Sequence, residues 1–589
     1  MVYETSYGIG QKPFCPDPNR GKWEKPSDFI FACIGLALKL DVFDILFHSH
    51  HNLGIFGIWL YFVYMVIYLV PIIVIHSFMG QFSSSGFISA FRLSPVFKGM
   101  GYLSVCLSLS MLICYSIYAA IPLLFIINSF RPTLPWSCEG FTAWFNESSG
   151  RSTICDVRIN RESSAFQDYT SLEVPSVLYF DNLFNSTRED RFTDINDDFE
   201  LSWHFVGLFA MVWAIISLIF FKFSETAKFG KFIRYMVIAT LGLLLVCFVR
   251  FCFLPGGFSW LNKYAAPKPY NFVESSVSTF FIAMQAFGAG WGSVIALSSF
   301  NSFKTNITSY SWIISFGQIF IYIMFSLISA MLEHHFKDLA DDSDEVDVMN
   351  SWVRILSSAS ALSTMSWPNL WTLIYYTTLL MAAVILITTQ IFTVLQSLFD
   401  EFEELRVRKQ EATFGLIGGL AFCSIFFCTN HGIAFFSTFL ADAIFHHNFL
   451  HLLLLLVVLW IYGRERFQQD IEFMLGQPFA FWKIFILRFI APICFVICLP
   501  IGIDLSLLNH TWISVELHVM SIIMLGLPLL AIPGYGLYYL SQSTGAFWDR
   551  LRRSCRPTDW YPVEMEHRQQ YEKAGDDTEM TNQLTEEQI

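Results

Sequence analysis

The chain has 589 residues, of which 54% are hydrophobic and only 14% are charged, and 62 of them are phenylalanine. A water-soluble protein could not bury that much apolar surface, so the composition excludes a soluble globular domain and indicates a multi-pass membrane protein. The net charge of -13 reflects acidic loops and an acidic tail, such as the run at 338–347, which we interpret as solvated surface. No basic patch or glycine-rich phosphate loop points to a nucleic-acid partner.

Twelve hydrophobic segments are each close to the roughly 20 residues that cross the hydrocarbon core of a bilayer. They centre on residues 28–47, 56–79, 102–127, 202–221, 232–254, 276–299, 310–333, 371–398, 412–428, 433–461, 484–503 and 515–541. The polar N-terminus has no cleavable signal pattern, so we expect the first segment to be retained. The sequence thus predicts an all-α membrane protein with an N-terminal segment at 1–26, a membrane domain at 27–545 and a tail at 546–589. We expect the polar tail after Ser541 to be loosely ordered.

Lysine and arginine gather in alternate short loops. These loops or flanking stretches contain Lys22, Lys25, Arg92, Lys98, Lys222, Lys228, Lys231, Arg234, Lys304, Arg406, Arg408, Lys409, Arg464, Arg466, Lys483, Arg552 and Arg553. The opposite short loops, near 48–52, 429–432 and 505–511, contain neither residue type. Because cytoplasmic loops carry the excess of lysine and arginine, both termini are predicted to be cytoplasmic.

The longest loop, roughly 130–200, then lies outside the cell. It contains the triplets that begin at Asn146 and Asn185, which are typical glycan acceptors in that compartment. It also contains Cys138 and Cys155, and the oxidising environment favours a disulfide bond between them.

The sixth segment carries three glycines, Gly288, Gly290 and Gly292, at its centre. Each weakens a helix by up to about 1 kcal/mol relative to alanine. One interpretation is close helix packing through small residues. The other is a helix that breaks halfway across the membrane and presents free backbone groups to a ligand. The glycines alone leave both open.

Several short motifs recur in order along the chain. They are RGKW at 20–23, IGLA at 34–37, MGQ at 79–81, FKGMGY at 97–102, LPW at 134–136, GAGWG at 288–292, DEF at 400–402, WIYGRERFQQDIEFMLG at 460–476 and RFIAP at 488–492. Together they resemble the neurotransmitter:sodium symporter family, solute carrier family 6. The resemblance implies a leucine-transporter-like fold, with a five-plus-five inverted repeat and broken first and sixth helices around a central site. It also implies a plasma-membrane transporter rather than an enzyme.

The positions that match the family's ion ligands have changed. They hold Val42, Ala286, Gln318, Ile385, Leu386 and Ile387 for sodium, and Tyr61, Ile282, Ala286 and Tyr322 for chloride. A hard cation needs several oxygen ligands, and most of these side chains offer none. Backbone carbonyls at Gly35, Ala37 and Leu38 remain, but alone they make a poor cage. The residues therefore argue against ordinary sodium and chloride coupling, and no other cofactor is expected.

Lys39 stands in the middle of the first segment, where the family's monoamine transporters carry aspartate. A lysine at that depth costs at least about 2.5 kcal/mol, so it marks a functional site by default. It could bind a substrate carboxylate or replace the missing sodium as a cation; the structural alternative is a pair with Asp41 or Asp44. His76, at a family glutamate position, is interpreted as a hydrogen-bonded structural residue. By matching, the other candidate substrate-binding residues are Tyr115, Gln285, Gly288, Trp291 and Gln390.

The two gates of the family differ in this chain. Arg20 and Asp400 match the ion pair of the cytoplasmic gate, and Trp23 matches its neighbouring tryptophan; these three residues are called the inner gate below. At the outer gate, Ile45 and Leu440 replace the charged pair. A chain that keeps one gate can still change conformation.

Two functions remain open at this stage. The first is a secondary transporter that moves a small amino-acid-like solute by alternating access, with altered or absent ion coupling. The second is a non-transporting relative with a receptor-like or scaffolding role. A channel is disfavoured, because no ring of charge or filter sequence is present. The residues do not specify the substrate or the oligomeric state.

Overall fold

The computed structural model describes residues 14–41, 53–141, 174–183, 200–256, 258, 272, 273, 275–277, 279, 280, 292–340, 351–433, 436, 449–497, 519, 523 and 526–573. Within these ranges the regular structure is helical, and no strand is formed. One isolated backbone bridge joins Leu201 to Thr429. The prediction of an all-helical chain is confirmed for the described residues.

The helices in the first half of the chain are α1 (Pro26–Gly35), α3 (Ile55–Tyr64), η1 (Met65–Leu69), α4 (Val70–Ser83), η2 (Ser89–Leu93), η3 (Pro95–Phe97), α5 (Gly99–Asn128), α6 (Cys138–Phe141), α8 (Pro175–Asn182), α10 (Trp203–Lys222), α11 (Thr226–Phe251) and α14 (Ser293–Ser298). Those in the second half are α15 (Ile307–Ala340), α16 (Ser351–Ser363), α17 (Pro368–Glu401), α18 (Glu403–Val407), α19 (Lys409–Ser424), η6 (Ile425–Cys428), η7 (Val457–Gly463), α21 (Arg464–Leu475), α22 (Phe481–Phe485), η8 (Ile486–Ile490), α25 (Ala531–Gln542) and α26 (Phe547–Ser554).

Seven helical segments of the described chain are long and apolar enough to cross a membrane. They are Ile55–Ser83, Pro95–Asn128, Trp203–Lys222, Thr226–Phe251, Ile307–His335, Pro368–Glu401 and Lys409–Cys428. They coincide with the second to fifth and the seventh to ninth predicted segments. The other five predicted segments fall partly outside the described residues, so the total of twelve stays a prediction.

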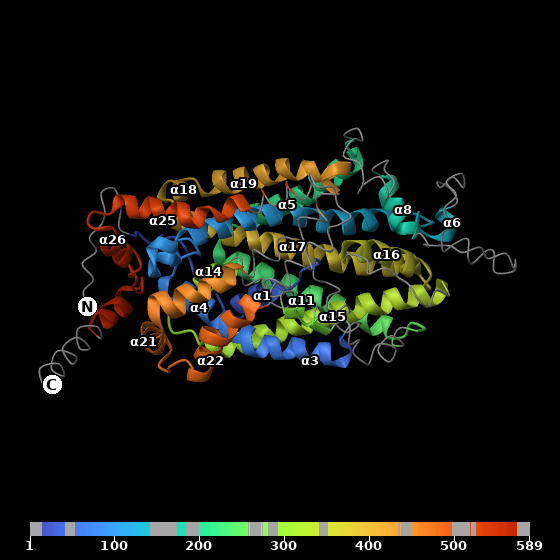
Figure 1. Ribbon diagram of the computed structural model, residues 1–589. Coiled ribbons are helices and arrows are strands. Elements are labelled where there is room, and N and C mark those ends of the chain that lie inside the picture. The colour runs from blue at the N-terminus through green and yellow to red at the C-terminus, as the bar shows by residue number, and fades with distance from the viewer. Residues whose placement is uncertain are drawn as a thin grey trace, which may run out of the picture.

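The long helices divide into an inner and an outer set. In the most apolar 18-residue stretch of each helix, 89% is buried inside the protein in α17, but only 33% in α11. A helix that is apolar on every side is stable either in a protein core or against lipid, which explains why both kinds have similar composition. α17 packs along α5 through the middle of the bundle, and α1 packs against α11 and α15 (Figure 1). The short helices α6 and α8 lie at one end of the molecule, and α21 and α26 lie at the other (Figure 1).

The first predicted segment does not continue as a helix. α1 ends at Gly35 after 10 residues, about 15 Å and half the thickness of a hydrocarbon core. Residues 36–41 are not helical; the chain turns at 36–37 and again at 40–41. In the sixth segment, Gly292 has a φ of +80°, a left-handed conformation that favours glycine, and α14 begins at the next residue. The neighbouring residues 42–52 and 281–291 lie outside the described ranges, so the two broken helices and the inverted repeat stay predictions.

The expectation of a loosely ordered tail is wrong for residues 547–573. α26 and a second helical stretch at 565–573 are packed against the bundle. Trp560 is 7% exposed, and its ring stacks on Phe82 of α4 at 5.1 Å between centroids. The tail is polar in overall composition, but it contains a few aromatic residues such as Trp560, and their burial is enough to hold it against the bundle.

Candidate functional site

A small cavity lies where the end of α1 meets α5 and α17. It has a volume of about 20 Å³, and its lining consists of Leu36, Lys39, Met111, Leu112, Tyr115, Leu386, Ile387 and Gln390. Three residues that the sequence predicted to bind substrate, Lys39, Tyr115 and Gln390, therefore share one chamber. The chamber has space for about one water molecule. Sequence matching did not single out the apolar wall from α5, because Met111 and Leu112 look like ordinary core residues.

Lys39 lies beside an acidic group just beyond the end of α1. The lysine is 4% exposed and interacts electrostatically with Asp41. Asp41 in turn accepts a hydrogen bond from the hydroxyl of Tyr115, with 2.5 Å between the two oxygens. A buried charge is tolerated when an opposite charge and hydrogen bonds compensate it, so Asp41 accounts for the survival of a lysine at this depth. The predicted structural interaction with Asp41 is thus present, although it does not exclude a substrate role; Asp44 lies outside the described residues.

Gln390 also makes a contact that sequence matching did not predict. Its side-chain oxygen accepts a hydrogen bond from the hydroxyl of Ser293, the first residue of α14. Thr393, one turn further along α17, also donates to Ser293, at 3.5 Å. Gln390 therefore ties α17 to the point where the helix resumes after Gly292. No motif marks Ser293, because its role depends on a helix about 100 residues away.

The described positions matched to sodium ligands do not suit a hard cation. The side-chain amide of Gln318 donates a hydrogen bond to the backbone oxygen of Cys33 at 2.7 Å, so it presents N–H rather than oxygen toward α1. A methyl carbon of Ile385 lies 3.0 Å from where a Cβ on Gly35 would stand, so hydrocarbon fills that side. The carbonyl of Gly35 accepts the N–H of Leu38 in a turn. These described positions thus offer sodium, which needs several oxygen ligands, an N–H and hydrocarbon, while the loss of sodium dependence stays a prediction.

The described positions matched to chloride ligands make ring contacts, and so does His76 in the second predicted segment. Tyr61 and Tyr322 are both buried, and their rings stack at 5.1 Å with an angle of 1° between the planes. His76 lies against His451, with 5.4 Å between ring centroids and an angle of 5°, and His451 also interacts electrostatically with Lys39. The hydrogen bonding expected for His76 stays a prediction.

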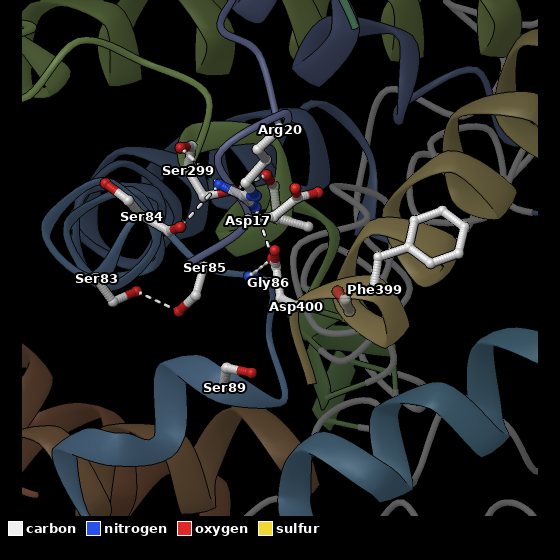
Figure 2. Close-up of polar contacts among 12 residues, drawn as sticks. Asp17, Arg20, Ser83, Ser84, Ser85, Gly86, Ser89, Ser299, Phe399 and Asp400 are labelled. Carbon is white, nitrogen blue, oxygen red and sulfur yellow. Dashed lines mark hydrogen bonds and ion pairs between the residues drawn. The ribbon is translucent and has the colours of Figure 1, made fainter. Parts of the chain in front are cut away.

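The inner gate is closed by a buried ion pair (Figure 2). Nη2 of Arg20 lies 2.8 Å from Oδ2 of Asp400, and the two side chains are 9% and 2% exposed. Nη1 of Arg20 donates to the backbone oxygens of Ser84 and Ser299, each at 2.9 Å. Oδ2 of Asp400 also accepts the backbone N–H of Gly86 at 2.6 Å. One guanidinium thus connects the N-terminal segment, the end of α4, the end of α14 and the end of α17.

Trp23 fixes the same segment to α14. Its indole Nε1 donates to the backbone oxygen of Leu297 at 2.8 Å, and its ring packs edge-on against Phe300 at 5.3 Å. Asp17 adds an ion pair with Lys409 at 2.5 Å. Although burial alone would raise it, the hydrogen bond and charge of Lys409 hold the pKa of Asp17 below its ordinary value of 3.8. The structure therefore brings Arg20, Trp23 and Asp400 together as the sequence predicted.

The remaining predicted positions lie outside the described residues. They are the pocket residues Gln285, Gly288 and Trp291, the matched ion positions Val42, Ile282 and Ala286, the outer-gate positions Ile45 and Leu440, and the loop residues Asn146, Cys155 and Asn185. Cys138 begins α6, but its disulfide bond with Cys155 stays a prediction, as do the two glycans.

A bundle of membrane-length helices around a small cavity with three polar side chains, with a buried ion pair at one end, is typical of membrane transport proteins. The family model described as "Sodium:neurotransmitter symporter family" matches residues 20–543, and the chain belongs to this family. The resemblance seen in the sequence motifs is confirmed. The relatives in this family are transporters rather than enzymes, which agrees with the prediction that the chain is not an enzyme.

Two relatives illustrate the distance within the family. The chain is 23% identical over 597 residues to the Homo sapiens protein "Sodium- and chloride-dependent neutral and basic amino acid transporter B(0+)", with 93% of this chain and 90% of that protein covered. It is 26% identical over 493 residues to the Bos taurus "Sodium-dependent dopamine transporter", with 81% of this chain and 68% of that protein covered. Similarity therefore extends over most of the membrane domain.

Proposed function

We propose that the protein is a plasma-membrane secondary transporter that moves a small amino-acid-like solute by alternating access, with both termini in the cytoplasm. The observation that carries the proposal is the cavity that unites Lys39, Tyr115 and Gln390 just beyond the end of α1. Apolar walls with a few convergent polar groups are typical of small-molecule sites. The two relatives, whose names specify amino acids and dopamine, support a substrate of this size.

Lys39 is the residue that we expect to select the substrate. A solute that carries a carboxylate would exchange its hydration for the lysine ammonium and the phenol of Tyr115. Asp41 would then act as the counter-charge that keeps Lys39 in place in the empty site. A volume of about 20 Å³ holds about one water molecule, so binding of an amino-acid-sized solute would require the surrounding helices to move apart.

Ion coupling in this proposal differs from that of the named relatives. Gln318 presents N–H toward α1, and Ile385 places hydrocarbon against Gly35. We propose that transport is independent of sodium and chloride, and that the fixed charge of Lys39 takes the place of a bound cation. The proposed chloride independence rests on the sequence, because Ile282 and Ala286 at the matched positions offer no side-chain hydrogen-bond donor, whereas Tyr61 and Tyr322 keep their hydroxyls.

A second candidate is a non-transporting member of the family with a receptor-like role. Hydrocarbon at the matched sodium positions favours it, since a chain without coupling has lost the driving force for accumulation. The intact gate pair of Arg20 and Asp400 favours transport, because a permanently static protein has no use for a reversible closure.

Uptake measurements separate the two candidates. Cells that express the full chain are given a panel of labelled amino acids, with sodium replaced by choline in a parallel set. Uptake that persists in choline and falls at least about tenfold in Lys39→Ala, but not in the exposed control Lys228→Ala, supports the proposal. Absence of uptake for every solute at normal surface expression supports the non-transporting candidate. Uptake that disappears in choline contradicts sodium independence.

A further inference from the structure

A group of basic and aromatic side chains lies where the chain enters its eleventh predicted membrane segment, 484–503. The group, called the interfacial patch below, comes from α15, η7, α22, η8 and the residues just before α22, and it consists of Trp312, Trp460, Phe479, Trp482, Lys483 and Arg488. α22 lies toward the end of the molecule where α21 and α26 lie (Figure 1). The loop charges predict that this end is cytoplasmic, so the patch lies at the boundary between lipid and cytoplasm.

Lys483 occupies a cage of three aromatic rings. Its ammonium lies 5.5 Å from the ring centroids of Trp312 and Trp482 and 5.6 Å from that of Phe479, and the residue is 9% exposed. Aromatic faces attract a cation, but they replace few of the hydrogen bonds that an ammonium makes in water. Among the described residues, no carboxylate pairs with Lys483 and no oxygen accepts a hydrogen bond from it. Its N–H donors therefore remain available to an acceptor from outside the chain.

Arg488 repeats this arrangement five residues further along. Its guanidinium carbon lies 4.4 Å from the ring centroid of Trp460 and 5.5 Å from that of Phe489. Its Nε is buried and has no hydrogen-bond partner in the described part of the chain, and no ion pair forms there either. A charged side chain inside a membrane segment is costly and seldom persists without a partner. The guanidinium thus lacks an acceptor that its five N–H groups could share.

An apolar strip lies beside the two cations. Phe481, Phe485 and Phe489 recur every four residues along α22 and η8, and they are 63%, 48% and 39% exposed at the protein surface. The rings of Phe485 and Phe489 contact each other at 5.3 Å between centroids. Side chains at this spacing share one face of a helix, so the strip offers a continuous apolar surface to lipid.

We propose that the interfacial patch binds an anionic phospholipid of the cytoplasmic leaflet, with its phosphate as the missing acceptor for Lys483 and Arg488 and its acyl chains along the phenylalanine strip. A phosphate can accept two parallel hydrogen bonds from one guanidinium, which suits a planar group already held on a tryptophan face. Basic pockets between membrane helices on the cytoplasmic side are typical sites for anionic headgroups.

The charges around the patch favour a headgroup with net negative charge over a zwitterionic one. Arg464, at the start of α21, adds a third cation, 5.7 Å from the ring centroid of Phe481. Its partner Glu465 is 3.7 Å away and 83% exposed, so it neutralises Arg464 poorly. The aromatic faces are already occupied by Lys483 and Arg488. A choline group would therefore meet like charges and find no free aromatic cage, whereas a phosphatidylserine headgroup keeps a net negative charge.

Native mass spectrometry of the purified full chain, with phosphatidylserine and phosphatidylcholine of identical acyl chains added in equal amounts, tests the proposal. The wild type should bind phosphatidylserine at least about fivefold more tightly than phosphatidylcholine. Lys483→Gln and Arg488→Gln should each weaken phosphatidylserine binding about fivefold, and the double variant about 25-fold. Phosphatidylcholine binding should change less. Arg488→Lys keeps the charge but loses the planar fork, so its affinity should lie between those of wild type and Arg488→Gln.

Arg408→Gln is the matched control. It removes one positive charge from the same predicted side of the membrane, but Arg408 is 74% exposed, contacts Glu411 and lies outside the interfacial patch. Its affinity for phosphatidylserine should equal that of the wild type. Size-exclusion profiles verify the folding of each variant, and Lys483→Gln decides the outcome if Arg488→Gln does not fold.

Inorganic phosphate separates a lipid site from a general phosphate site. Because it cannot contact the phenylalanine strip, a roughly tenfold excess of it over lipid should leave bound phosphatidylserine in place. Displacement of the lipid by this excess would contradict a phospholipid as the occupant.

Three further results would overturn the proposal. Equal affinity of the wild type for the two lipids would show that the patch does not select an anionic headgroup. Unchanged phosphatidylserine binding in Lys483→Gln or in the double variant would place the lipid elsewhere. An equal loss in Arg408→Gln would show a general effect of charge. Because no transport is measured, failure of the proposed function leaves these outcomes unaffected.

Discussion

Removal of Arg20 tests the inner gate most directly. In Arg20→Ala, Asp400 keeps the N–H of Gly86 but loses its guanidinium, and the backbone oxygens of Ser84 and Ser299 lose a shared donor. Asp400 is 4% exposed, so water reaches its carboxylate poorly while the gate is closed. The substitution therefore penalises the closed state far more than an open state in which the carboxylate is hydrated.

The size of the effect follows from the burial of the pair. Removing one partner of a buried ion pair costs about 3–5 kcal/mol, mainly because the other charge stays behind without compensation. At the lower bound of about 3 kcal/mol, the ratio of open to closed gate rises about 150-fold. Even a wild-type protein that opens its gate rarely would then be open for a substantial fraction of the time.

A native cysteine reports the opening. Cys33 on α1 is fully buried, whereas Cys15 in the N-terminal segment is exposed and serves as an internal reference. We expect a membrane-impermeant thiol reagent on the cytoplasmic side to label Cys33 much faster in Arg20→Ala, as measured by peptide mass spectrometry. The control is Arg408→Ala, whose 74% exposed side chain contacts Glu411 at 3.7 Å and contributes little. Equal rates of Cys33 labelling in the two variants would refute the claim that the Arg20–Asp400 pair keeps the cytoplasmic side closed.

Three further outcomes follow from particular residues. Gly292→Ala should lower the melting temperature by several degrees, because φ is +80° and the new Cβ would lie 2.7 Å from Phe87, whereas Gly418→Ala, with open space around it, should have no such effect. Trp23→Ala should cost about 3–5 kcal/mol of stability through its lost ring packing and carbonyl contact, measured as loss of thermal stability; a melting curve unchanged from wild type would contradict this. In Asp470→Asn, hydrogen exchange of the docked tail residues 557–573 should depend less on pH between 5.5 and 7.5 than in the wild type, whose tail is held more tightly at the acid end because burial raises the pKa of Asp470 to about 6.

The gate illustrates how far sequence reasoning reached. The motifs predict an ion pair between Arg20 and Asp400, which are 380 residues apart, and the structure places Nη2 of Arg20 2.8 Å from Oδ2 of Asp400. Their further partners, Ser84 and Ser299, were not predicted, because a backbone oxygen leaves no signature in the side-chain pattern. Gln390 shows the same limit, since its contact with Ser293 arises from the meeting of two helices and not from either segment.

The amino-acid sequence alone determined the membrane class, the family and the pairing of Arg20 with Asp400, because hydrophobic length, charge in loops and short motifs are local properties of the chain. It also placed a lysine in the middle of the first segment and so marked the candidate site. Only the tertiary structure decided that Asp41 and Tyr115 accompany Lys39, that Ile385 fills the space beside Gly35, and that the tail docks on Asp470. Those contacts join segments far apart in sequence, and their stability comes from burial and from hydrogen bonds that exist only once the helices have packed.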